Sequence, residues 1–161
     1  MKILVVSDTH RHSENLYKVI EMEKPLDMII HCGDIEEPDD YLRGVANCPV
    51  CIVSGNNDFF YHYDREMLVP LSGFKGFITH GHNYYISMGV EMLSKEAKSR
   101  GADFAFFGHT HRPFNDIVNG VRMINPGSLS YPRQEGKQPS YAILNINNGQ
   151  YDCTIKYLDA R

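Results

Sequence analysis

The chain has 161 residues, of which 42% are hydrophobic and 22% are charged, as in ordinary folded proteins rather than disordered ones. We expect one domain spanning residues 1–161, because this length leaves no room for a second substantial domain. Its 16 basic and 20 acidic residues give a net charge of −4. That balance argues against a protein that binds extended nucleic acid by neutralising its phosphates.

The apolar segment at residues 3–6 is too short for a signal peptide or a membrane span, and no other segment approaches about 18 apolar residues. We therefore expect no membrane partner and a cytoplasmic location, where the four cysteines would be reduced thiols. Cys48 and Cys51 have the spacing of half a zinc site or of a redox pair. Because no second such pair exists, we interpret them as small apolar residues at the start of a strand.

The first half of the chain alternates short apolar segments with helical patterns. Apolar runs predict buried strands at residues 2–7, 27–31 and 50–54. The spacing of apolar residues predicts a helix over residues 14–24, which Pro25 ends, and a short helix over residues 39–46. This order of elements predicts right-handed crossovers and a parallel sheet.

The second half begins with a predicted strand at 76–79, a helix at 89–99 stopped by Gly101, and a buried strand at 103–107. Asn119-Gly120 and Asn148-Gly149 lie between β-type segments and predict hairpin turns. The chain therefore starts as α/β and ends in antiparallel strands. A two-sheet β-sandwich of mixed strands, flanked by helices, accommodates both halves.

Polar side chains that can bind metal ions follow five of the predicted strands. These clusters are Ser7-Asp8-Thr9-His10, His31-Cys32-Gly33-Asp34, Ser54-Gly55-Asn56-Asn57-Asp58, Thr79-His80-Gly81-His82 and Gly108-His109-Thr110-His111. Because ligands of open α/β sheets bind at the carboxyl ends of strands, we expect the clusters to meet in one crevice. One such cluster arises readily by chance, but five at strand ends indicate a metal centre.

The spacing within these clusters suits paired ligands. In an extended segment residues i and i+2 point the same way, so we expect Asp8 with His10, and His109 with His111, to present ligands on one face. Imidazole combined with carboxylate or amide oxygen suits manganese, iron, zinc, nickel or cobalt better than calcium. The negative net charge does not exclude a phosphate substrate, because bound metal ions would invert the local field.

Taken in order, the motifs resemble those of the calcineurin-like metallophosphoesterase superfamily. They are Asp8-x-His10, Gly33-Asp34, Gly55-Asn56-x-Asp58, His80-Gly81-His82 and Gly108-His109-x-His111. The short length and the segment 125–133 (NPGSLSYPR) resemble its small YfcE-like prokaryotic phosphodiesterase branch. The resemblance runs from Lys2 to about Arg133. It implies a four-layer α/β/β/α fold and is much less specific for the substrate, because one fold hosts many substrates.

The resemblance implies two divalent cations per chain. Manganese is the first candidate, and nickel, cobalt, iron or zinc are the alternatives. One ion would be held by Asp8, His10 and His111, and the other by Asn56, His80 and His109, with Asp34 bridging both. Cations about 3.5–4 Å apart would share a hydroxide that attacks phosphorus directly. The implied catalytic residues are Asp34, Asn56, Asp58 and His82, the last at the substrate mouth or behind the ligands.

Position 57 departs from the commoner superfamily pattern, in which a histidine there protonates the leaving group or binds a phosphoryl oxygen. Asn57 cannot act as an acid near neutral pH, which favours the phosphodiesterase branch, where this histidine also tends to be absent. The leaving-group acid stays open among His12, His82 and solvent. Asn57 and Arg133 are candidate substrate contacts, since arginine forms paired hydrogen bonds to phosphate; a solvated arginine is the alternative.

An aromatic cluster follows the asparagine motif, formed by Phe59, Phe60, Tyr61 and Tyr63. These rings could stack on a base or aryl group, but we favour the contact surface of a homo-oligomer. The predicted function is hydrolysis of a small phosphodiester. Alternatives are a metal-binding scaffold of the same fold, like the retromer subunit that resembles this family with a degraded metal set, and a phosphomonoesterase or nucleotide pyrophosphatase. The complete set of seven acceptable ligands favours an enzyme.

Overall fold

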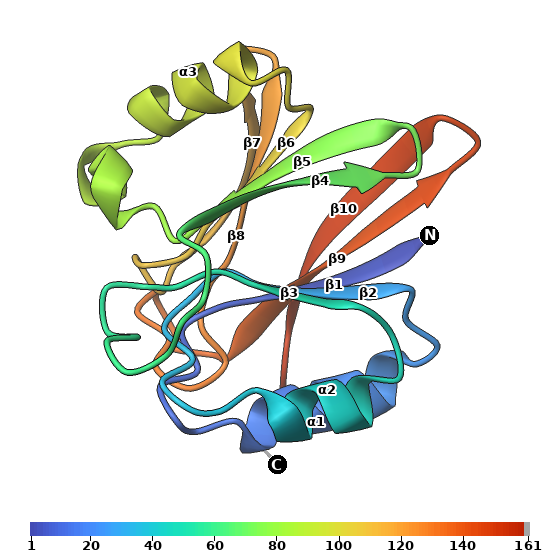
Figure 1. Ribbon diagram of the computed structural model, residues 1–161, viewed down its shortest axis with the longest axis vertical. Coiled ribbons are helices and arrows are strands. Elements are labelled where there is room, and N and C mark those ends of the chain that lie inside the picture. The colour runs from blue at the N-terminus through green and yellow to red at the C-terminus, as the bar shows by residue number, and fades with distance from the viewer. Residues whose placement is uncertain (160–161) are drawn as a thin grey trace.

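The computed structural model describes residues 1–159, which form the strands, α-helices and 3-10 helices shown in Figure 1. In chain order these are β1 (Lys2–Val6), α1 (Glu14–Glu23), β2 (Met28–His31), α2 (Asp40–Ala46), β3 (Val50–Ile52), β4 (Glu66–Leu71), β5 (Phe74–Thr79), η1 (His82–Tyr84), η2 (Ile86–Met88), α3 (Glu91–Ser99), β6 (Phe104–Phe106), β7 (Pro113–Val118), β8 (Val121–Pro126), β9 (Ser140–Asn147) and β10 (Gln150–Tyr157). The predicted strands and helices are all present, with ends shifted by a few residues.

The strands form two five-stranded sheets. The first has the order β10-β9-β1-β2-β3, in which β1, β2 and β3 are parallel and β9 and β10 are antiparallel additions. The second has the order β4-β5-β6-β8-β7, with β5, β6 and β8 parallel and an antiparallel strand at each edge. Both sheets are therefore mixed, as the change of pattern along the sequence predicted.

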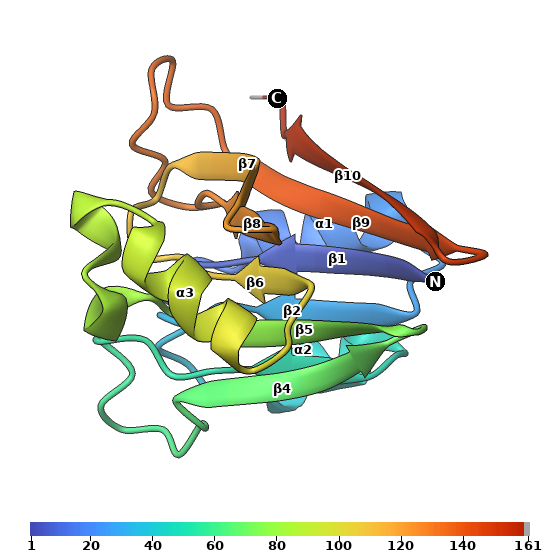
Figure 2. The ribbon, with the colours of Figure 1, turned by 90° about the horizontal axis from the view of Figure 1, so that it is seen from above.

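Apolar side chains form three cores between the helices and sheets. Helices α1 and α2 bury Leu16, Val19, Ile20 and Leu42 against the outer face of the first sheet. The inner faces of the two sheets enclose a second core (Ile3, Val5, Ile30, Phe104 and Phe106 among its members). Helix α3 lies over the outer face of the second sheet, as Figure 2 shows. Leu93 and Ala97 of this helix belong to the apolar core between the two. The predicted sandwich flanked by helices, with four layers, is confirmed.

The predicted hairpins join β7 to β8 and β9 to β10. Both residues of each Asn-Gly pair have positive φ, at 52° and 79° for Asn119 and Gly120 and at 50° and 74° for Asn148 and Gly149. Two-residue hairpin loops need this left-handed backbone at both positions, which asparagine and glycine adopt most readily. Ser72 and Gly73, with φ of 50° and 94°, make a third such turn between β4 and β5.

Strand β4 was not predicted from the sequence. It contains Pro70, which lacks an N–H for the strand ladder, and Leu68, whose side chain is 46% exposed. A proline within an apolar run is a signal against a central strand. It is tolerated here because β4 lies at the edge of its sheet and, within residues 1–159, pairs with β5 alone.

The register of the parallel strands brings their carboxyl ends to the same level. Val6 of β1 lies opposite His31 of β2, which lies opposite Ile52 of β3. In the other sheet Ile78 of β5 and Phe106 of β6 lie opposite each other. The polar clusters that follow these strands therefore gather along one edge of the sandwich. None of the helices within residues 1–159 has the length and apolar character needed to span a bilayer.

Candidate metal centre

The loops that carry the candidate ligands turn through left-handed backbone. The φ angles are 56° at Asp8, 46° at His10, 54° at Asp34, 68° at His109 and 57° at His111. The expectation of extended i, i+2 pairs is therefore wrong, because each loop bends sharply as soon as its strand ends. Left-handed conformations at residues other than glycine cost roughly 1–3 kcal/mol each and cluster at functional sites.

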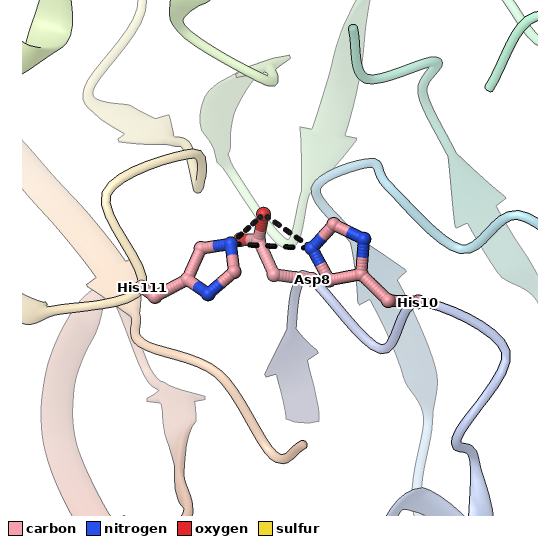
Figure 3. Close-up of side chains that lie close together, drawn as sticks. All are labelled: Asp8, His10 and His111. Atoms are coloured by element: carbon pink, nitrogen blue, oxygen red, sulfur yellow. Dashed lines mark hydrogen bonds and ion pairs between the residues drawn. The ribbon is translucent and has the colours of Figure 1, made fainter. Parts of the chain in front are cut away.

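Asp8, His10 and His111 converge from two loops of opposite sheets (Figure 3). The Asp8 Oδ1 atom lies 3.2 Å from His111 Nε2 and 3.8 Å from His10 Nε2, and the two Nε2 atoms are 3.2 Å apart. Asp8 is fully buried, yet its Oδ1 has no hydrogen-bond partner. A buried, unpaired carboxylate oxygen facing imidazole nitrogens is costly unless a cation satisfies it. These three residues therefore fit a divalent metal ion.

Asp34 lies between the two halves of the centre. Its Oδ2 is 3.9 Å from His10 Nε2 on one side and 3.4 Å from His80 Nε2 on the other. His80 Nε2 is also 3.8 Å from Asp8 Oδ1, so that Asp8, Asp34 and His80 make a second group of suitable atoms for a metal ion. Carboxylate and imidazole side chains in this number suit manganese and its neighbours in the first transition series.

Asn56 brings an amide oxygen to the far side of His80. Its Oδ1 lies 3.1 Å from His80 Nε2 and 3.0 Å from His109 Nδ1. One residue from each of three loops thus faces the same point. The structure brings all seven of the predicted metal ligands into one continuous cluster.

The other ring nitrogen of three histidines is already occupied. His80 Nδ1 donates to Cys32 O at 2.7 Å, and His111 Nδ1 donates to Tyr131 O at 2.8 Å. His10 Nδ1 contacts the Glu36 carboxylate. An acceptor on Nδ1 keeps the proton on that nitrogen, so Nε2 can present a lone pair to a metal ion.

The carboxylates are held by donors from neighbouring loops. Asn57 donates its backbone N–H to Asp34 Oδ1 and its side-chain amide to Asp34 Oδ2, both at 2.8 Å. The amide of Asn57, predicted as a substrate contact, is thus directed at Asp34. Asp8 Oδ2 accepts from Ser7 Oγ at 2.6 Å and from the N–H of His109 at 3.1 Å. These bonds fix the direction of both carboxylates.

Asp58, predicted among the catalytic residues, accepts three backbone hydrogen bonds. Its Oδ2 accepts from the N–H groups of Asp34 and Gly55, and its Oδ1 from that of Glu36, each at 2.7 Å. The carboxylate thereby ties the loop after β2 to the loop after β3. Its place in the structure is that of a support for Asp34.

Burial and neighbouring charges have opposite effects on the pKa values of Asp34 and His80. Burial by itself raises the pKa of Asp34, but the hydrogen bond with His80 and the nearby His80 charge lower it well below its usual value. For His80 burial lowers the pKa, and Asp34 and Asp8 outweigh it and raise the pKa to about 9. Burial lowers the pKa of His109, and the charge of His80 adds to this. The lowered pKa of Asp34 and the raised pKa of His80 thus share one main cause, the ion pair between them, at the place where a cation would neutralise the same carboxylates.

Two glycines allow this close packing. A Cβ atom added at Gly55 would lie 2.0 Å from Asp34 Oδ1, and one at Gly108 would lie 1.9 Å from Ser7 Oγ and 2.6 Å from Asp8 Oδ2. Real Cβ atoms do not approach this closely. Glycine is required at both positions so that neighbouring loops can reach the carboxylates.

His82 and Arg133 flank the centre. The His82 ring centroid lies 5.5 Å from that of His80, and its side chain lines a cavity of about 490 Å³ next to Asn56. Burial, followed by the charges of His80 and His109, lowers the pKa of His82. The exposed Arg133 lines two further cavities, one of about 680 Å³ beside His109 and one of about 720 Å³ beside His10 and His111.

The aromatic cluster divides into two pairs. Phe59 and Phe60 are 79% and 82% exposed. Tyr61 and Tyr63 stack on each other with ring centroids 6.0 Å apart, and Tyr63 donates its hydroxyl hydrogen to Glu37 O at 3.1 Å. The exposed apolar surface in this cluster is therefore that of the two phenylalanines.

Sequence reasoning missed the contribution of Glu36, whose carboxylate contacts His10 Nδ1. The available signal was its position two residues after Asp34, in a loop already expected to lie at the metal centre. His31 is buried and neutral, because burial chiefly lowers its pKa to about 4. It accepts from the N–H of Gly33 at 3.2 Å and contacts Thr9 Oγ1 at 3.1 Å, so it supports two of the ligand-bearing loops.

Comparison with known proteins agrees with this geometry. Residues 1–149 match the calcineurin-like phosphoesterase superfamily domain. The chain is 35% identical to the "Probable metallophosphoesterase YsnB" of Bacillus subtilis, covering 99% of this chain and 91% of that protein. It is 32% identical to "Phosphodiesterase MJ0936" of Methanocaldococcus jannaschii, covering 79% and 83%.

Solved structures show the same fold. A predicted phosphoesterase from Streptococcus pneumoniae superposes with a TM-score of 0.85 at 28% identity, covering 97% of this chain and 88% of that one. A Vps29 variant from Entamoeba histolytica superposes with a TM-score of 0.78 at 22% identity, covering 99% and 100%, which is evidence for the fold alone. Members of the family bind divalent metals through Asp and His clusters such as the one described above. The chain belongs to the calcineurin-like phosphoesterase superfamily.

Proposed function

We propose that this protein hydrolyses small phosphodiesters with two divalent cations, manganese being the first candidate and nickel, cobalt, iron or zinc the alternatives. The observation that carries the proposal is the position of Asp34 Oδ2, which lies between His10 Nε2 at 3.9 Å and His80 Nε2 at 3.4 Å. A carboxylate with imidazole groups on both sides suits a bridge between two cations.

The seven side chains divide into two sets around this bridge. One set has Asp8, His10 and His111, whose ligand atoms lie within 3.8 Å of one another. The other has Asn56, His80 and His109, which meet at Asn56 Oδ1. When bound, the cations would neutralise the charge of a phosphoryl group and make a coordinated water acidic enough to act near neutral pH.

Other side chains around the centre would hold the ligands in position and orient a bound substrate. Asn57 and Asp58 keep Asp34 and its loop in place through the hydrogen bonds described above. Glu36 holds the ring of His10. His82 and Arg133 lie at the cavities on either side of the centre, where they would meet the ester groups of a bound substrate. Such positioning is the main contribution of a protein to phosphoryl transfer.

The rival proposals are a protein-binding scaffold and an enzyme for phosphomonoesters or nucleotide pyrophosphates. The convergence of all seven ligands supports an enzyme over a scaffold. Two observations support diesters over monoesters. Asn57 stands where an acidic side chain would protonate the leaving group, and one of the relatives is named a phosphodiesterase. We also propose a contact between copies of the chain in the cytoplasm through Phe60, which is 82% exposed and does not line the cavity beside Asn56.

The test measures metal content and hydrolysis together. Protein loaded with manganese should contain two ions per chain and cleave bis-p-nitrophenyl phosphate, and EDTA should abolish this activity. Asp34→Asn should lose at least one ion and lower kcat/KM by more than about 100-fold, since even partners of metal ligands contribute 10–100-fold. Asp116→Asn changes an exposed carboxylate of β7 and should alter neither quantity.

A metal content of one ion per chain in the wild type would contradict the two-cation proposal. Hydrolysis that persists undiminished in EDTA would contradict metal-dependent chemistry altogether. Cleavage of p-nitrophenyl phosphate in strong preference to the diester would favour the phosphomonoesterase alternative.

A further inference from the structure

A cavity of about 490 Å³ opens beside the Asn56 and His82 side of the metal centre. Its lining includes Asn56, Phe59, Tyr61, Tyr63, Arg65 and His82. The His82 ring centroid is 5.5 Å from that of His80 and 6.1 Å from that of His109. One end of the cavity is therefore at the metal centre, and its volume lies within the range of about 300–1,000 Å³ usual for small-molecule sites.

Three aromatic side chains line this cavity, and contacts outside it hold two of them, Tyr61 and Tyr63, in place. The Tyr63 hydroxyl bonds to Glu37 O at 3.1 Å, and the Tyr61 ring stacks on Tyr63 at 6.0 Å with an interplanar angle of 22°. Phe59 lies on the same lining and keeps 79% of its side chain exposed. A fixed ring beside a free ring offers aromatic faces to a planar group without large rearrangement.

The charges around the cavity do not favour a cationic group. The carboxylate of Asp58 is occupied by three backbone N–H groups, whereas the exposed Arg65 adds a positive charge to the lining. His62, Asn83 and the Nδ1 atom of His82, which is buried without a hydrogen-bond partner, add polar groups. The lining thus combines aromatic faces with hydrogen-bonding groups and no free acid.

We infer, on the basis of the proposed phosphodiesterase function, that this cavity binds a planar aromatic ester group of the substrate, an aryl ring or a nucleobase. Phosphate at the metal centre would direct one ester group past Asn56 and His82 toward Phe59 and Tyr61. Stacking of a base or aryl ring on aromatic side chains is favourable and tolerant of ring identity. The cavity therefore selects substrates by the ring next to the phosphate.

Two phosphonates that cannot be hydrolysed test this inference by calorimetry on the manganese-loaded protein. Phenylphosphonate and methylphosphonate carry the same charged group and differ in the ring. We expect phenylphosphonate to bind about tenfold more tightly, the size of effect that one aromatic contact with ring burial provides. Phe59→Ala should bring the two dissociation constants close together by weakening phenylphosphonate alone, and Phe59→Trp should preserve the difference.

Phe60→Ala is the matched control, because Phe60 is the adjacent ring, is 82% exposed and does not line the cavity. It should leave both constants unchanged. A ratio near one in the wild type, or an equal loss in Phe60→Ala, would overturn the aromatic subsite. If the wild type then still cleaves bis-p-nitrophenyl phosphate, only the subsite fails. If it binds neither phosphonate and cleaves no diester, the proposed function fails as well.

Discussion

Several residues around the centre are not candidate ligands themselves but hold the candidate ligands in position through hydrogen bonds. Asn57 is one example, since the sequence pattern suggested a missing acid and a candidate substrate contact at this position. Its backbone and side-chain N–H groups each donate to one oxygen of Asp34 at 2.8 Å. Glu36 serves His10 in the same way. These partners set the direction of the ligand atoms, which sequence motifs do not describe.

Glu23, far from the centre, links the end of α1 to the first sheet. It is 7% exposed and accepts from Lys156 Nζ and Tyr141 Oη, both at 2.8 Å, with Lys2 Nζ at 2.9 Å. Burial raises its pKa, but the hydrogen bonds from Lys156, Lys2 and Tyr141 outweigh this and lower the pKa to about 2. The stability it contributes is thus complete above the unfolded pKa of about 4.3 and is lost as pH falls toward 2.

Glu23→Gln should lower the free energy of unfolding at pH 7 by about 1–3 kcal/mol, because it leaves buried donors poorly paired. The difference from the wild type should shrink between pH 5 and pH 2. Urea unfolding across this pH range measures both effects. Glu21→Gln, on the same helix but 67% exposed, is the control and should change little. A difference that is constant with pH would contradict the assigned ion pairs.

At the scale of the elements, helix α2 contains a glycine that its packing does not require. Gly44 lies within Asp40–Ala46, and a Cβ added there meets no atom within 4 Å. Glycine inside a helix costs about 0.5–1 kcal/mol relative to alanine. Gly44→Ala should therefore raise the free energy of unfolding by that amount, as measured by urea denaturation, without affecting hydrolysis.

Gly108→Ala provides the contrast, since its Cβ would lie 1.9 Å from Ser7 Oγ. That variant should be destabilised and should lose metal. If Gly44→Ala were destabilised to the same degree, the difference between a permissive helix position and a required close approach would be refuted. The two variants together separate the effect of backbone freedom from that of space.

At the scale of the whole molecule, the two sheets share one inner core and one set of ligands. Ile3, Val5 and Ile30 of the first sheet pack with Phe104 and Phe106 of the second. Neither sheet can unfold without exposing the inner face of the other. We therefore propose that residues 1–161 form one domain, whose halves are joined at the edge by the metal centre.

Thermal unfolding should accordingly show a single transition, with equal calorimetric and van't Hoff enthalpies. Manganese should raise the midpoint and EDTA should lower it. Ions that bind only the folded state stabilise it by about 2.7 kcal/mol at a concentration 100 times the Kd. Calcium, which prefers oxygen ligands, should raise the midpoint less. Two separated transitions, or a midpoint indifferent to manganese, would contradict this account of the molecule.

The sequence by itself determined the elements whose signals are local. Apolar runs marked the buried strands, Asn119-Gly120 and Asn148-Gly149 marked two hairpins, and the clusters at strand ends marked the candidate ligands. These signals depend on residues within a few positions of each other, so no tertiary information was needed. Strand β4 was not predicted because it contains Pro70. A proline is tolerated only where its strand lies at a sheet edge, and the local sequence does not show which strands are edges.

Only the tertiary structure decided how the ligands meet. The N–H of His109 reaches Asp8 across 101 positions of the chain, and the Ser128 hydroxyl reaches the Asp8 carbonyl across 120. The left-handed turns at Asp8, His10 and Asp34 aim side chains in directions that an extended segment would not. Which atom faces which depends on the packing of one sheet on the other. That packing is the sum of many apolar contacts, and no local motif records it.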